Sequence, residues 1–158
     1  MTLHPCHAPS RLLAAAALGA LALLLGAAGP ARAAFTPDPS SDVTVIPVGG
    51  KDYLLINEGA VVVPLVGPGT FYGYARAGFA PGEDGAKPGL VRIAGLGERT
   101  IRIPLDFTPS PSSTWDDGRP GLPSGGRRFE VHVPEGRWNL RLSGEVPEGG
   151  ILTAVLYR

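Results

Sequence analysis

Glycine and proline interrupt nearly every window of this chain after residue 34. Because either residue breaks a helix in its interior, the chain favours short extended segments separated by turns. Apolar and polar residues alternate in the period of two that is typical of strands with one buried face. The alternation is clearest in residues 99–107, 128–133 and 137–143. These features predict an all-β fold.

Further apolar segments lie at residues 43–48, 52–57, 60–66, 70–77, 90–94 and 151–157. The whole set predicts about seven to nine strands, which is typical of a sandwich or barrel. Gly49-Gly50 and Gly67-Pro68-Gly69 are expected to form tight turns between strands. We therefore expect a single antiparallel β-sandwich, jelly-roll or immunoglobulin-like, over residues 43–158. The long connections at 80–89 and 108–127 are expected to be either working or flexible loops.

Residues 1–33 have the pattern of a secretory signal peptide. Arg11 precedes the uncharged run 12–29, and Ala31-Arg32-Ala33 offers a small-x-small site, so cleavage is expected between Ala33 and Ala34. An uncleaved membrane anchor is the alternative, because the run reaches the lower end of the roughly 17–25 residues that span a bilayer. The sequence thus predicts a signal-peptide helix and an extended tail at 34–42. The protein would be exported to the periplasm or the exterior, and the membrane would be contacted only before cleavage.

Cleavage would remove the only cysteine and all histidines except His132. The mature chain would have no thiol for a disulfide and no His/Cys cluster for a metal, so neither metal nor cofactor is predicted. No Gly-x-Ser-x-Gly motif is present, and His132 falls on the outward face of its strand. Loss of Arg11 and Arg32 leaves a formal charge of about −2, which gives no general attraction to nucleic acid.

The loop at 108–127 contains Trp115, Asp116, Asp117 and Arg119, a polar concentration beside an aromatic ring. One interpretation is a turn, since Asp-Gly and Pro-Gly pairs follow. A second is contact with a ligand, in which the indole serves as a sugar platform or a protein contact. A third is a hydrolase whose two carboxyls lie about 5–10 Å apart. For Trp115 itself, the alternative to ligand contact is that the loop folds back onto the sandwich.

Outward-facing arginines recur on three predicted strands: Arg102, Arg128, Arg137 and Arg141. If these strands pair, the arginines could form a patch for an anionic glycan or an acidic partner. Glu130 and Asp106 share that face, and cross-strand ion pairs on a solvated sheet are the alternative.

Two stretches resemble the pre-peptidase C-terminal type of secreted β-sandwich. The first runs from Asp52-Tyr53 to Tyr74-Ala75-Arg76, through Gly67-Pro68-Gly69, and the second covers residues 133–142. The resemblance implies a non-catalytic accessory domain of the kind that is normally appended to exported hydrolases. The acidic positions of that family are not matched, since Thr70, Phe71 and Gly73 occupy the region, and metal binding is not implied.

Together these features predict an exported, non-catalytic domain that binds a cell-envelope glycan or a protein partner. The first alternative is a structural subunit of an envelope or surface assembly that pairs through a strand edge. The second alternative is a carboxylate-based hydrolase that uses Asp116 or Asp117.

Overall fold

The structure is a computed structural model, which describes residues 34–39, 42–147 and 150–158. These residues belong to one compact unit, Arg32–Arg158. The signal-peptide helix expected within residues 1–33 lies outside the described residues. So does the centre of the expected tail, at residues 40–41.

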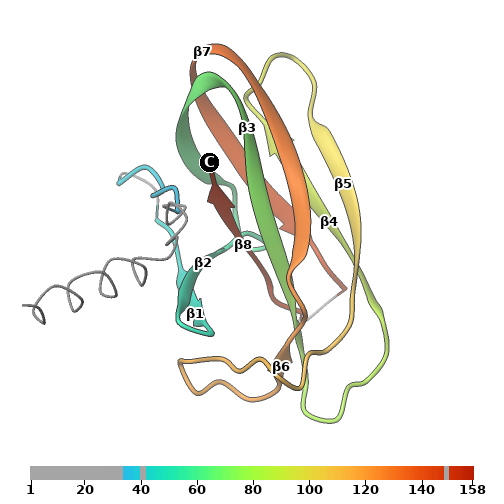
Figure 1. The fold of residues 1–158 in the computed structure, drawn as a ribbon. Coiled ribbons are helices and arrows are strands. Elements are labelled where there is room, and N and C mark those ends of the chain that lie inside the picture. The colour runs from blue at the N-terminus through green and yellow to red at the C-terminus, as the bar shows by residue number, and fades with distance from the viewer. Residues whose placement is uncertain (1–33, 40–41, 148–149) are drawn as a thin grey trace, which may run out of the picture. The chain divides into compact units, whose positions relative to one another are not determined.

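All regular secondary structure in the described residues consists of β-strands (Figure 1). The strands are β1 (Val45–Val48), β2 (Lys51–Leu55), β3 (Val61–Phe79), β4 (Lys87–Ala94), β5 (Ile101–Phe107), β6 (Leu122–Pro123), β7 (Arg127–Glu145) and β8 (Leu152–Tyr157). They pair in the order β1-β2-β8-β3-β7-β4-β5, and β6 pairs with the end of β3. All of these pairings are antiparallel, so the prediction of an all-β antiparallel fold is confirmed.

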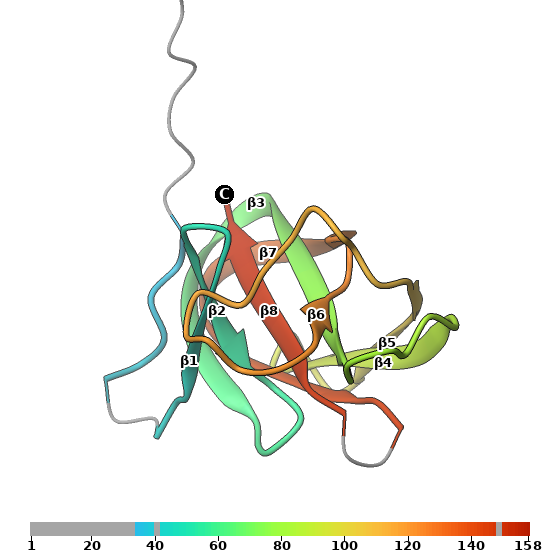
Figure 2. The same ribbon diagram turned by 90° about the horizontal axis from the view of Figure 1, so that it is seen from below.

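The two longest strands, β3 and β7, have 19 residues each and pair from Val61 opposite Leu142 to Ala75 opposite Arg127. Their register shifts between Gly67 and Gly69, where the sheet bends. The bend, where β3 and β7 turn over at the top of Figure 1, divides the sheet into two arms, and the view from below shows that the sheet is curled (Figure 2). The first arm contains β1, β2, β8 and residues 69–79 and 127–133. The second contains β4, β5 and residues 61–67 and 136–145.

The bend corrects one prediction, because Gly67-Pro68-Gly69 does not reverse the chain. Gly67 lies opposite Gly136, and a Cβ on Gly67 would stand 1.9 Å from the Pro134 carbonyl oxygen. The two Gly/Pro segments, 67–69 and 134–136, therefore let the two backbones approach closely. As a result, the strands predicted at 60–66 and 70–77 form the single bent strand β3, and those at 128–133 and 137–143 form β7. Since the strands form one hydrogen-bonded sheet, the finer assignment to a jelly-roll or immunoglobulin-like sandwich stays a prediction.

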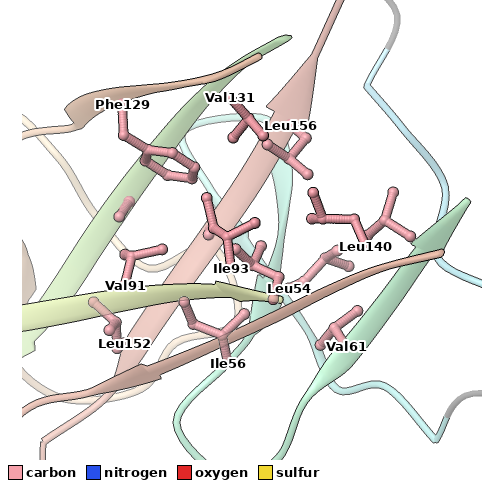
Figure 3. Packing of buried hydrophobic residues seen from close by; sticks show 14 of the residues in the cluster. Leu54, Ile56, Val61, Val91, Ile93, Phe129, Val131, Leu140, Leu152 and Leu156 are labelled. Carbon is pink, nitrogen blue, oxygen red and sulfur yellow. The ribbon is translucent and has the colours of Figure 1, made fainter. Parts of the chain in front are cut away.

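The main hydrophobic core draws side chains from both arms (Figure 3). Phe71 and Leu156 come from the first arm, and Ile93 and Leu140 from the second; all are almost fully buried. Ile56 joins the arms, because its N–H donates to Leu152 and its carbonyl accepts from Gly144 N, at 2.9 and 2.7 Å. The curl is thus fixed by burial and by backbone hydrogen bonds.

The apolar face predicted for residues 99–107 is only partly buried. Phe107 is fully buried, but Ile103 and Leu105 are half-buried and Ile101 is 40% exposed. The reason is that β5 is the last strand of its arm, so part of its apolar face has no neighbour.

Candidate functional site

A pocket of about 350 Å³ lies where β3 ends and where β4 and β8 begin. We call it the end pocket, and its size falls within the range of small-ligand sites. Its apolar wall is formed by Phe79, Trp115, Ile151 and three prolines: Pro81, Pro120 and Pro147. Three loops that are distant in the sequence therefore build one concave surface.

The charged part of the end pocket is the pair Lys87 and Glu83. The Lys87 side chain is only 11% exposed, and its Nζ lies 2.9 Å from Glu83 Oε1. The same ammonium donates to the Gly78 carbonyl at 2.9 Å and lies 4.7 Å from the Phe79 ring centroid. A lysine this buried needs such partners, because an unpaired charge would be costly there.

Glu83 remains ionised in this arrangement. The hydrogen bond from Lys87 lowers the pKa of the Glu83 carboxyl, and a second bond from Ala80 N lowers it further. A general acid needs a raised pKa, so Glu83 is poorly suited to donate a proton. The Lys87–Glu83 ion pair is therefore a polar group held in a fixed position at the pocket wall, and such a group can orient a bound ligand.

Trp115 connects the end pocket to a second, smaller hydrophobic cluster. It is 6% exposed and packs with Ile46, Val48, Tyr53, Leu55 and Val155. Its backbone forms a bridge with Val48, and the Arg119 guanidinium lies 5.4 Å from the ring centroid. The loop is thus folded back onto the sheet, and the indole offers no open face as a sugar platform, although part of it lines the pocket.

The two neighbouring carboxylates already have partners. Asp116 Oδ2 accepts from Gly50 N at 2.7 Å, and its own N–H donates to the Pro47 carbonyl, so it ties the loop to the β1–β2 turn. Asp117 accepts from Arg119 Nε at 2.9 Å, and this ion pair lowers the pKa of its carboxyl. Neither residue lines the end pocket. The hydrolase hypothesis gains no support from this geometry.

Arg128 does not lie with the other predicted arginines. It belongs to the first arm, where it pairs with Glu130 at 2.7 Å and stacks over Tyr72 at 4.3 Å from the ring centroid. On the same strand, exposed His132 Nδ1 lies 3.0 Å from the Thr70 hydroxyl, so the expectation of an outward histidine is confirmed. Cross-strand and same-strand partners explain this surface without a ligand.

Arg102 and Arg141 are exposed on the second arm, together with Arg137. Arg102 lies directly opposite Arg92 on β4, a residue that the sequence interpretation did not single out. Arg92 forms an ion pair with Glu145 through Nη2, and its Nε is buried without a hydrogen-bond partner. Two of the predicted arginines are therefore brought together, but with Arg92 rather than with Arg128.

Sequence reasoning also missed Glu83 and Lys87. The pair lies in an expected polar loop, where charged residues ordinarily face solvent, and nothing local distinguishes it. The rarity of lysine is a usable signal for Lys87. Lys51 and Lys87 are the only lysines among the 14 lysine and arginine residues of the chain.

Comparison with protein-family models and with curated protein sequences finds no match to this chain. The resemblance to pre-peptidase C-terminal domains therefore stays a prediction. Within residues 34–39, 42–147 and 150–158, no group of three or more His, Cys, Asp or Glu side chains could hold a metal ion. The same part of the chain contains no helix that is long and apolar enough to cross a membrane.

Proposed function

We propose that the protein is an exported, non-catalytic domain of the β-sandwich type that binds a cell-envelope glycan or a protein partner through the end pocket. The observation that carries the proposal is the composition of the pocket wall. The three prolines and Ile151 present apolar surface, the nearly buried Phe79 and Trp115 rings support it from beneath, and the Lys87–Glu83 pair adds one fixed polar group. Binding to such a surface costs little conformational entropy in the protein.

The chemistry of the pocket favours binding over catalysis. Its ammonium donates to Gly78 and Glu83, and its carboxylate is held ionised by Lys87 and Ala80. A carboxyl with a lowered pKa is a poor general acid, and an ammonium that donates to two acceptors has no free electron pair for nucleophilic attack. An occupant would instead place an apolar group against the prolines and a polar group near the ion pair.

The test is to obstruct the pocket without disturbing the core. Ala80 is exposed and lines the pocket, so Ala80→Phe places a ring at its mouth. Ala86→Phe is the matched control, because Ala86 is exposed in the same loop but does not line the pocket. We expect a glycan array or an envelope pull-down to give a ligand for the native protein and for Ala86→Phe. Ala80→Phe should lose most of the signal. Absence of any ligand for the native protein, or equal capture by Ala80→Phe, would contradict the proposal.

A second candidate function is assembly through a sheet edge. The terminal strands of the sheet, β1 and β5, carry exposed apolar side chains, with Val45 47% and Ile101 40% exposed. The loop covers part of the β1 edge, where Val48 bridges Trp115 and the Pro47 carbonyl accepts from Asp116 N, so β5 offers the more open edge. Unpaired edges with apolar side chains favour strand addition by another chain. Oligomers that grow with concentration in sizing experiments would support this candidate, and a monomer at all concentrations would remove it.

A further inference from the structure

Three arginines lie together on the outer face of the second arm, and we call them the arginine row: Arg92, Arg102 and Arg141. Arg102 on β5 is the direct cross-strand partner of Arg92 on β4. Arg92 in turn lies opposite Ser143 on β7, and Arg141 is two residues from Ser143. Since alternate residues of a strand share a face, all three side chains project from one side of the sheet. Adjacent strands are about 4.8 Å apart, so the three cations repeat at close intervals.

The arginine row has too few anions within the protein itself. Like charges directly opposite each other on a sheet repel, as Arg92 and Arg102 must. Glu145 is the one carboxylate that forms an ion pair with the row among the described residues, and it contacts Arg92 through Nη2. In the same part of the chain Arg102 and Arg141 are exposed and form no ion pair. Asp106 shares the face but lies at the opposite end of β5.

We propose that the arginine row binds an acidic polysaccharide, whose sugar carboxylates bridge neighbouring guanidinium groups. The planar guanidinium matches a carboxylate through two parallel hydrogen bonds, and a polymer with regularly spaced carboxylates suits cations that repeat from strand to strand. Beside the row lie small or aliphatic residues, Val62, Pro64 and Ala94, which leave room for sugar rings.

The same face argues against nucleic acid. The outward positions of the paired strands here carry no aromatic side chain in the described residues, so bases would find nothing on which to stack. The proposal is independent of the end pocket, because none of the three arginines lines it. A negative result for the arginine row therefore leaves the proposal for the end pocket unchanged, and a negative result for the end pocket leaves the proposal for the arginine row unchanged.

The experiment measures binding of the purified protein to polygalacturonate, with neutral dextran, poly-glutamate and double-stranded DNA as comparisons. We expect polygalacturonate to bind and neutral dextran not to bind, with affinity falling between about 50 and 200 mM salt. The double variant Arg102→Gln/Arg141→Gln should weaken binding by about tenfold or more. Arg102→Lys keeps the charge but loses the planar fork, and it should show a smaller loss.

The matched control is Lys51→Gln/Arg128→Gln, which removes the same charge from exposed positions on the first arm. It should bind within about twofold of the native protein. Unchanged circular dichroism would show that each variant is folded. The proposal is overturned if native protein does not bind polygalacturonate, or if the control loses as much affinity as the arginine-row variant. It is also overturned if poly-glutamate or DNA binds as tightly as polygalacturonate.

Discussion

Gly67 is required at the bend of the sheet because of space, since a Cβ there would lie 1.9 Å from the Pro134 carbonyl oxygen. That oxygen belongs to the opposing backbone, which cannot rotate away as a side chain can. We predict that Gly67→Ala lowers the free energy of unfolding by about 3 kcal/mol, as overpacking against a rigid neighbour does. Urea unfolding measures the loss.

Gly69→Ala is the control for that prediction. A Cβ at Gly69 would meet only the Phe71 ring, at 3.5 Å, which is an ordinary contact. Its stability should therefore remain within about 0.5 kcal/mol of the native value. Equal stabilities for the two variants would show that the bend tolerates a side chain at Gly67.

The pair Arg92 and Arg102 gives a second prediction for single residues. Replacing Arg102 by glutamate puts a carboxylate directly opposite a cation, so repulsion becomes attraction. Arg102→Glu should raise the free energy of unfolding by about 0.5 kcal/mol at low salt, and the gain should shrink as salt screens the pair. Arg137→Glu is the control, because Arg137 lies opposite the uncharged Val66. A loss of stability in Arg102→Glu would contradict the assigned register.

At the scale of elements, the loop between β5 and β7 depends on Trp115 for its position. The indole is the only aromatic ring that this loop contributes to the second cluster. We predict that Trp115→Ala costs about 3–5 kcal/mol, as truncation of a buried tryptophan does, and that protease then cuts within residues 108–126. Limited proteolysis with mass spectrometry locates the cut. Trp138→Ala is the control, since Trp138 is half-buried on the second arm, and it should leave the loop resistant.

The strands could be predicted from the sequence wherever alternating apolar and polar residues correspond to buried and exposed side chains. Phe129, Val131 and Val133 are buried, as the period-2 pattern of residues 128–133 predicts. The merging of predicted strands into β3 and β7 could not be foreseen, because it depends on two Gly/Pro segments meeting across the sheet. Within one segment, a bulge that bends a strand and a turn that ends it have the same composition.

At the scale of the whole described unit, sequence reasoning found parts of the candidate sites but not their assembly. Trp115 was recognisable as an aromatic residue in a polar loop, yet its partners Val48 and Tyr53 come from a hairpin far away in the sequence. The end pocket likewise forms from three separate loops, and the arginine row depends on the register that sets Arg92 against Arg102. Long-range register is the information that local patterns lack.

Two carboxylates give the unit a defined response to acid. Their ion pairs with Lys87 and Arg119 lower the pKa of Glu83 and of Asp117 below ordinary values of 4.5 and 3.8. The unfolded chain therefore binds protons at a higher pH than the folded chain does. The stability that these groups contribute is complete above the ordinary pKa values, and it is lost as the pH falls through the lower folded values.

We therefore predict a melting temperature that is nearly constant above about pH 5 and falls below about pH 4. Glu83→Gln should show a shallower fall, because its folded and unfolded states no longer differ in proton uptake at this position. Asp84→Asn is the control in the same loop, since Asp84 forms no ion pair with any described residue. High salt should also flatten the native curve, mainly through the Asp117–Arg119 pair, because its side chains are the more evenly exposed, at 29% and 28%. An acid transition of equal steepness in native protein and Glu83→Gln would show that the Lys87 pair does not couple folding to pH.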